Sequence, residues 1–302
     1  MSNKNLALIA ATFVAVIYGM SYTIAKDVMP LYIDAYGFIL LRVGGAVILF
    51  WAISLAANLC QFVKKESIEK QDYPRIFWCA FYGVALNMLT FFKGLSLTTP
   101  ISAAVIMVST PIIVLVFSAI ITKEKLKTKK IVGVFIGLFG TAFLILYGKS
   151  FGSASNANLG NFLVLINAIS YAFYLIIVKK LMDKYNTFTF VKWIYLIGFF
   201  MVLPFGYAEF VVVSWAKLPI NILWEMGFIV VFTTFFTYLL NLLSMRELKP
   251  TSVAAFIYLQ PLFASIIAIG LGKDSLSWVK IVAAACIFLG VYLVSWSSKK
   301  SD

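Results

Sequence analysis

Polar side chains set within long apolar stretches are the residues of this 302-residue sequence that could do chemistry. Burying an amide or a hydroxyl without a hydrogen-bond partner is costly, so each one indicates a wet cavity, a specific partner or a ligand. Tyrosine adds a ring that can stack on a small molecule or attract a cation. We therefore expect a site for a small polar molecule, although many hydroxyl groups could instead join helices to one another. The candidate binding residues are Tyr18, Asn87, Ser109, Asn167, Tyr171, Thr234, Tyr238, Tyr258 and Gln260.

The sequence lacks the residues of the common catalytic and metal sites. It contains no histidine, and its three cysteines, Cys60, Cys79 and Cys286, are too widely spaced for a CxxC motif. All twelve acidic residues fall at the ends of apolar stretches or between them, so no buried carboxylate pair is expected. We expect no metal, no cofactor and no enzymatic activity, and an intramembrane enzyme is the disfavoured alternative.

One arginine and two prolines lie inside apolar stretches. Arg42 is roughly 10 Å from the start of its stretch at the helical rise per residue. Its side chain could extend to the membrane surface, pair with Asp34, or contact an anionic group of a substrate. Pro111 and Pro261 cannot donate a hydrogen bond to the residue four positions earlier, so the backbone should loosen near mid-membrane. These prolines could serve as gating hinges or be tolerated kinks.

Ten apolar stretches position these residues. The chain is 62% hydrophobic, 17% aromatic and 12% charged, with a mean hydropathy of +0.97, a composition that excludes an ordinary soluble domain. A membrane-crossing helix needs about 20 mostly apolar residues. We therefore predict an all-α integral membrane protein with ten transmembrane helices, at residues 6–25, 36–57, 75–97, 101–122, 131–147, 159–179, 187–206, 224–243, 251–270 and 278–296.

The basic residues predict how the chain is oriented in the membrane. The sequence contains 25 Lys and Arg against 12 Asp and Glu, and seventeen of the basic residues fall in the termini and breaks on one side, against six on the other. The positive-inside rule then places both termini in the cytoplasm, with Lys65 and Lys127 inside and Lys149 and Lys217 outside. The rule accounts for the net charge, so no nucleic-acid partner is expected.

The chain contains an internal repeat. A shift of 150 residues aligns PISAAVIMVSTP at 100–111 with PTSVAAFIYLQP at 250–261, and then KEKLKTKKIV at 123–132 with KDSLSWVKIV at 273–282. Tyr18 and Tyr171 correspond in a weaker match at a shift of 153. We therefore expect two five-helix halves, at 1–150 and 151–302. Because five is odd, the second half should cross the membrane in the opposite sense, an inverted repeat typical of secondary transporters.

These repeat segments resemble the two EamA-type repeats of the drug/metabolite transporter superfamily, over essentially the whole chain. The shared features are the aromatic-glycine pair Tyr18-Gly19, Arg42, the prolines Pro111 and Pro261, and the acidic residues Glu124 and Asp274 after the fourth and ninth stretches. The resemblance implies a secondary transporter with a central cavity. Family members mostly export amino acids or other small metabolites, and more distant relatives carry sugar phosphates or nucleotide sugars.

We therefore expect a multi-pass protein of the bacterial inner membrane that exports a small polar metabolite, such as an amino acid, by alternating access around a midplane cavity. A sugar-phosphate or nucleotide-sugar carrier is the alternative, but it would need several basic groups at the cavity, and Arg42 is a poor supply. The fifth and tenth stretches, nearly devoid of polar residues, should be peripheral. Gly133, Gly137 and Gly140 form a small-residue stripe that could pack within a monomer or between the subunits of a homodimer.

Energy coupling by protons usually requires a buried titratable group that meets both sides of the membrane. With no histidine and no acidic residue at the midplane, we expect movement of the substrate down its own gradient. A sodium site formed by backbone carbonyls near the two prolines, with hydroxyls such as Ser109 or Thr110, is the alternative.

Overall fold

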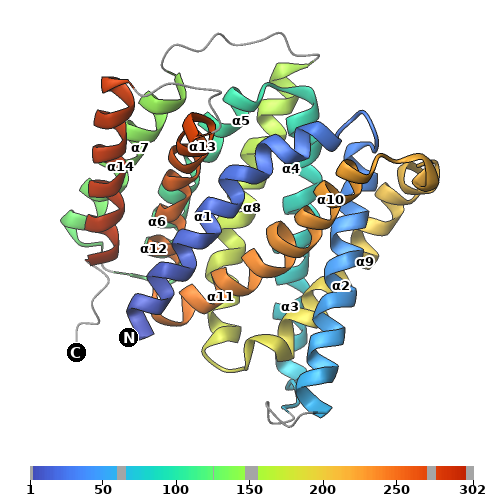
Figure 1. Cartoon of the computed structure of the whole chain (residues 1–302). Helices are drawn as coiled ribbons and strands as arrows, with labels where there is room; N and C mark the ends of the chain where they lie inside the picture. Colours follow the sequence, from blue (N-terminus) through green and yellow to red (C-terminus); the bar gives the residue numbers. More distant parts are fainter. Residues whose placement is uncertain (1–2, 60–65, 125, 147–155, 271–276, 297–302) are drawn as a thin grey trace.

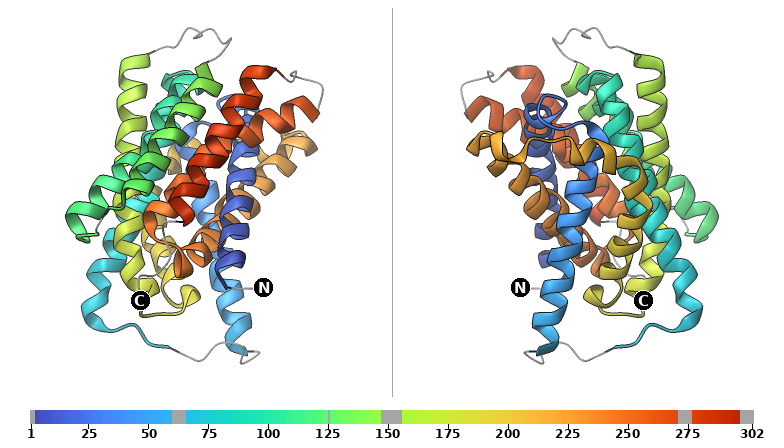
Figure 2. Two further views of the ribbon diagram at one scale, coloured as in Figure 1. Left: turned by 90° about the vertical axis from the view of Figure 1, so that its left-hand side faces the viewer. Right: turned by 90° about the vertical axis from the view of Figure 1, so that its right-hand side faces the viewer.

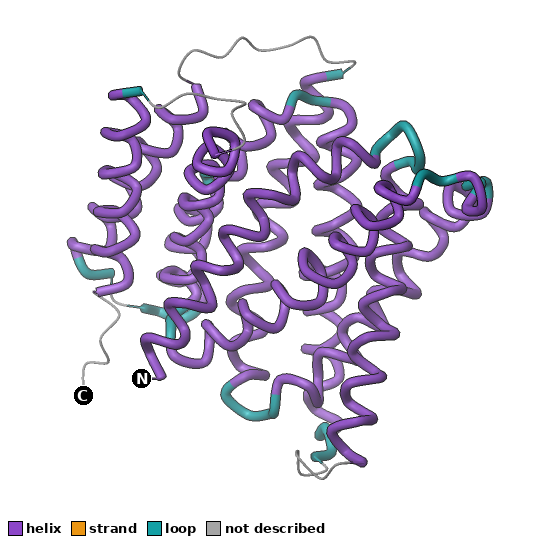
Figure 3. The backbone as a smooth tube through the Cα atoms, in the orientation of Figure 1, coloured by secondary structure: helices purple, strands orange, loops and turns teal. Residues whose placement is uncertain are grey.

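A computed structural model describes residues 3–59, 66–124, 126–146, 156–270 and 277–296, and every regular element in these ranges is helical (Figures 1 and 3). Ten helical segments are long and apolar enough to cross a membrane, which confirms the predicted number. Inside a bilayer a helix satisfies its own backbone hydrogen bonds, so apolar stretches of this length fold as helices. The predicted positions Lys65 and Lys149 lie outside the described residues.

The first half of the chain contributes α1 (Asn3–Val28), α2 (Ala35–Leu59), the 3-10 turn η1 (Lys70–Asp72), α3 (Tyr73–Ala80), the π-helix η2 (Phe81–Ala85), α4 (Leu86–Leu97), α5 (Pro100–Met107), α6 (Thr110–Ile121) and α7 (Thr128–Leu146). The second contributes α8 (Ala157–Met182), α9 (Thr187–Val211), η3 (Trp215–Lys217), α10 (Ile220–Phe228), the π-helix η4 (Ile229–Phe236), α11 (Thr237–Glu247), α12 (Pro250–Ala255), η5 (Phe256–Tyr258), α13 (Leu259–Gly270) and α14 (Trp278–Trp296).

Polar residues cap the N-termini of several helices and so determine where these helices begin. Asn156 and Asn186 accept hydrogen bonds from the backbone N–H groups of Leu159 and Phe188, at 3.3 and 3.1 Å, and so cap α8 and α9. Thr99 caps α5 in the same way, and Pro100 occupies the first turn, where no backbone donor is needed. The short polar breaks of the sequence therefore define the helix ends.

Helix packing follows one pattern in both halves. α2 packs along α9, α7 along α14, α1 along α11 and α13, and α8 along α4 and α6. Exchanging the corresponding helices of the two halves converts the α1–α11 contact into the α8–α4 contact and the α1–α13 contact into the α8–α6 contact. The α2–α9 and α7–α14 contacts remain the same, and this arrangement is consistent with an inverted repeat. α7 and α14 lie together at one edge of the molecule, as expected for the fifth and tenth stretches (Figures 1 and 2).

The small-residue stripe of α7 packs within the chain. A side chain at Gly133 would come within 2.8 Å of the Gly290 carbonyl oxygen on α14, and one at Gly290 within 2.5 Å of the Gly137 backbone nitrogen. Gly140 similarly meets Ala283 and Cys286 of α14. Glycine is therefore required here for the close approach of two helix backbones in the monomer.

The two mid-span prolines interrupt their helices at corresponding places. α5 ends at Met107, and α6 begins at Thr110 with Pro111 in its first turn. In the other half α12 gives way to the 3-10 turn η5, and α13 with Pro261 follows. Since neither proline can donate to the carbonyl four residues earlier, the predicted loosening at both places is confirmed.

Candidate functional site

A cavity of about 130 Å³ lies between the two halves, lined by residues of α1, α2, α4, α5, α8, η4, η5 and α13. It extends from mid-helix toward the face that carries the α1–α2 and α4–α5 connections, because Ala25 and Leu95 line it three and two residues before their helices end. Neither α7 nor α14 contributes a lining residue. The lining residues are Tyr18, Ser21, Ala25, Arg42, Asn87, Met88, Phe91, Phe92, Leu95, Met107, Asn167, Tyr171, Ile229, Thr233, Ile257 and Gln260.

The structure brings six of the residues singled out in the sequence into this one cavity. Tyr18 and Tyr171 face it from α1 and α8, the first helix of each half, and Arg42 reaches it from α2. The residues that precede the two prolines by four positions, Met107 and Ile257, also line it. The irregular backbone at the proline breaks is therefore adjacent to the cavity. The six are Tyr18, Arg42, Asn87, Asn167, Tyr171 and Gln260.

The other four candidates are placed elsewhere. Tyr258 is fully buried and its ring packs against Gly137, so it is not among the residues that line this cavity with Gln260. Tyr238 packs among aromatic rings, and Ser109 bonds the backbone carbonyl of Ile106 at 2.6 Å, inside the proline break. Thr234 points to Arg42 rather than into the cavity. Ser21 and Thr233, which share a hydrogen bond of 2.9 Å, line the cavity instead.

Arg42 is the one basic residue among the described residues that line the cavity. It is only 5% exposed, so its side chain does not extend to the membrane surface. Its Nε donates to Thr234 Oγ1 at 3.0 Å, and its guanidinium lies over the Phe92 ring, 4.6 Å from the centroid. Among the described residues no carboxylate, Asp34 included, forms an ion pair with it. The two terminal nitrogens of the guanidinium therefore have no counter-charge among the described residues.

Asn167 supplies the opposite kind of group. Its Nδ2 donates to the Asn87 backbone carbonyl at 2.7 Å, which determines how the amide is oriented. Its Oδ1 is buried and has no hydrogen-bond partner, although the residue is only 3% exposed. An unmet acceptor in a cavity lining is suited to accept an N–H or O–H from a bound molecule.

Packed aromatic side chains fill the space between the cavity and the opposite face of the protein. Tyr238 of α11 packs edge-to-face on Tyr195 of α9, with ring centroids 4.8 Å apart, and also contacts Tyr174 of α8, at 5.7 Å. Phe50 of α2 completes the cluster, 4.8 Å from Tyr195. Tyr174 and Tyr238 follow the cavity residues Tyr171 and Thr233 along their helices, in the direction away from the cavity mouth.

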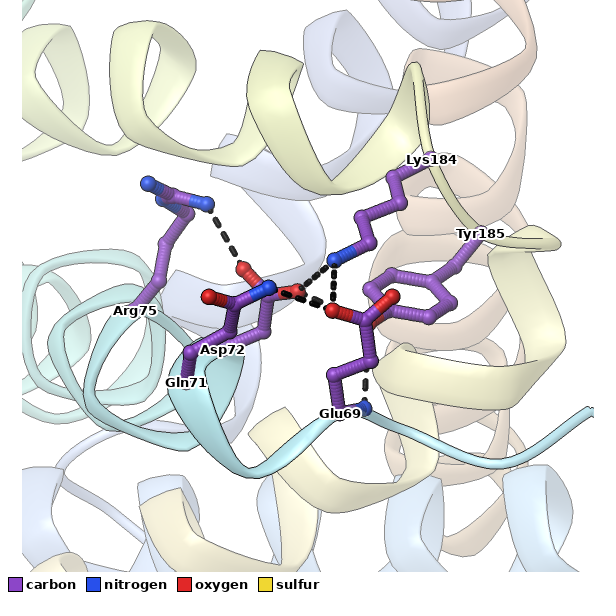
Figure 4. A network of polar contacts seen from close by, with 6 residues as sticks. All are labelled: Glu69, Gln71, Asp72, Arg75, Lys184 and Tyr185. Atoms are coloured by element: carbon purple, nitrogen blue, oxygen red, sulfur yellow. Dashed lines mark hydrogen bonds and ion pairs between the residues drawn. The ribbon is translucent and has the colours of Figure 1, made fainter.

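All six ion pairs of the described residues lie on this opposite face, at the α2–α3, α6–α7, α8–α9 and α11–α12 connections, which we call the basic face. Asp72 Oδ1 accepts from Arg75 at 2.8 Å, and its Oδ2 accepts from the Lys184 ammonium and the Tyr185 hydroxyl, both at 2.7 Å (Figure 4). Lys184 also pairs with Glu69 at 2.7 Å. This network joins the segment before α3 in the first half to the α8–α9 connection in the second.

A second network on the basic face also joins the two halves. The Glu124 carboxylate, between α6 and α7, pairs with Lys130 at 2.7 Å and with Lys249, before α12, at 3.2 Å. Burial acts to raise the pKa of Glu124, but the hydrogen bonds and charges of the two lysines outweigh it, so the pKa lies below its usual range. Hydrogen bonds to Asp72 and Glu69 raise the pKa of Lys184. These groups are therefore charged at neutral pH.

Comparison with known proteins identifies the family. The sequence profile of the EamA-like transporter family matches twice, over residues 5–146 and 158–296. An uncharacterized transporter of Archaeoglobus fulgidus is 24% identical over 230 residues, which cover 76% of this chain and 80% of that protein. The uncharacterized transporter YyaM of Bacillus subtilis is 22% identical over 254 residues, covering 81% and 82%. A solved crystal structure covers 97% of both chains with a TM-score of 0.73 at 15% identity, and so shares the fold. The chain is a multi-pass membrane protein and belongs to the EamA-like transporter family.

Proposed function

We propose that this protein is a secondary transporter that moves a small polar metabolite, such as an amino acid, out of the cell by alternating access. The observation that carries the proposal is the unequal state of the two faces. The cavity extends toward one face, whereas aromatic rings and two inter-half ion-pair networks close the basic face. A carrier that exposes one site to each side in turn requires such a closure to form and break during its cycle.

The positive-inside rule makes the basic face cytoplasmic, with both termini on that side, and the structure then corresponds to an outward-facing state. The proline breaks in both halves and the π-helix η4, which contributes Ile229 and Thr233 to the lining, supply irregular backbone beside the cavity. Irregular segments of this kind deform at lower cost than a continuous helix, which favours them as the places where the halves bend.

Coupling to protons is disfavoured because the described cavity lining contains no carboxylate and the sequence contains no histidine. We propose movement of the substrate down its own gradient. A sugar-phosphate carrier is disfavoured because Arg42 is the one cation of the described lining and its Nε is already bonded to Thr234.

The test is efflux from proteoliposomes loaded with individual radiolabelled amino acids and related metabolites. We expect saturable efflux of at least one of them, unaffected by an imposed proton or sodium gradient. Rates equal to those of protein-free liposomes for the whole panel would contradict a transport function for this substrate class. Uphill accumulation driven by either ion would contradict movement down the substrate's own gradient.

A further inference from the structure

The guanidinium of Arg42 carries a charge that no described residue balances with a counter-charge. Removing a cation from water is expensive unless it is paired, and this side chain is 5% exposed. Thr234 engages only Nε, and the Phe92 ring covers one face of the guanidinium. The terminal nitrogens remain as a pair of parallel donors, the arrangement that binds a carboxylate through two hydrogen bonds.

The rest of the lining narrows the ligand further. No described lining residue is acidic and none but Arg42 is basic, so the described lining offers one positive charge. A dianionic phosphate or a second carboxylate would be left without a partner, and an amine without a carboxylate would be repelled. Asn167 Oδ1, buried and unpartnered, requires a hydrogen-bond donor. The remaining surface is apolar, formed by Met88, Phe91, Phe92, Leu95, Met107, Ile229 and Ile257.

We propose that Arg42 binds the carboxylate of the transported molecule, that Asn167 accepts an N–H or O–H from the same molecule, and that its apolar substituent packs against the phenylalanine and methionine side chains. The ligand is therefore a monocarboxylate that carries a hydrogen-bond donor and a large apolar group. This assignment rests on the proposed transport function and specifies which two residues select the substrate.

The experiment measures binding by calorimetry on the full chain in detergent, with four probes of similar size. L-phenylalanine has all three features, 3-phenylpropionate lacks the donor, L-phenylalaninamide lacks the carboxylate, and L-glutamate replaces the apolar group with a second charge. We expect binding in the order phenylalanine, then phenylpropionate, with little or none for the other two. Equal affinity for the amide and the free acid, or no binding of either monocarboxylate at millimolar concentration, overturns the proposal.

Variants test the two residues. Arg42→Gln should weaken phenylalanine binding roughly ten- to a hundredfold, as expected for a lost charge-assisted pair, and Arg42→Lys should restore part of it. Asn167→Leu should abolish the preference for phenylalanine over phenylpropionate and leave phenylpropionate affinity unchanged. The control is Lys192→Gln, which removes another cation inside a span, one that contacts Trp51 and Ser54 away from the cavity.

Thermal unfolding of each variant separates loss of binding from loss of folding. If Arg42→Gln unfolds, Arg42→Lys and Asn167→Leu still discriminate among the probes. Unchanged phenylalanine affinity in folded Arg42→Gln overturns the carboxylate assignment. Efflux of a panel member that lacks a carboxylate would overturn this inference while leaving the transport function intact. Selective binding of phenylalanine without any efflux would overturn the transport function while leaving the binding assignment intact.

Discussion

Replacing Asp72 with asparagine should loosen the basic face without changing the size of the side chain. Asp72 is 3% exposed and accepts hydrogen bonds from Arg75, Lys184 and Tyr185. A hydrogen bond to a charged group contributes roughly 1.5–3 kcal/mol, and a neutral one roughly half as much. Its two basic partners are about a third exposed, so solvent screens part of the loss. We expect closure of the basic face to weaken by about 1–2 kcal/mol, equivalent to about 5- to 30-fold more opening.

Hydrogen exchange measures this opening directly. The backbone N–H of Glu69 donates to Tyr185, and that of Asn186 donates to Glu66, so both amides are protected only while the two halves are joined. In Asp72→Asn the segments 66–72 and 184–187 should exchange about 5- to 30-fold faster. Asp183→Asn is the matched control, because Asp183 pairs with Lys179 on the same face but is 60% exposed. Equal exchange in the two variants would refute the idea that the Asp72 network joins the halves.

Three further results are expected. Gly290→Ala should destabilise the protein by roughly 1–3 kcal/mol, because the new side chain would meet the Gly137 backbone nitrogen at 2.5 Å. The control for thermal unfolding is Gly227→Ala, whose new side chain would meet nothing within 4 Å, and equal melting temperatures of the two variants would contradict the prediction. Closure of the basic face should not change between about pH 5 and 9. The lowered pKa of Glu124 makes its contribution to closure complete above about pH 4.3, and the raised pKa of Lys184 keeps its contribution complete until alkaline pH. An exchange rate that rises between pH 6 and 8 would argue for another titrating group. In a chain freed of its native cysteines, an impermeant thiol reagent applied to intact cells should label a cysteine at position 217 and not one at 127, and the reverse pattern would invert the orientation.

The ten spans and the two proline breaks could be predicted from the sequence because their causes are local. Twenty apolar residues suffice for a membrane helix, and a proline disrupts its own helix whatever surrounds it. Tertiary packing decided what the sequence left open. Thr233 and Thr234 are adjacent and equally polar, yet one lines the cavity and the other bonds Arg42, inside a π-helix that no local pattern indicated.

Helical geometry explains why Tyr258 and Gln260 do not share the cavity. They lie two residues apart, and side chains at that spacing point to different sides of a helix, whether its turn is α or 3-10. Tyr258 consequently packs on Gly137 while Gln260 faces the cavity. The destination of Arg42 was likewise open in the sequence, since an arginine at that depth can reach the surface, an acid or a cavity. The residues that Arg42 meets where α2 packs against η4, Thr234 among them, determine that its side chain reaches the cavity.

Alternating access is the central claim, and cross-linking the basic face tests it most directly. Cysteines replace Glu69 and Lys184, whose side chains form an ion pair between the two halves at 2.7 Å, and a short bifunctional thiol reagent joins them in proteoliposomes. The account predicts that efflux stops on cross-linking and returns when the link is cleaved, while the same treatment of cysteines at 179 and 183, a pair on one side of the interface, leaves efflux unchanged. Continued efflux through the Glu69–Lys184 cross-linked protein would contradict the account.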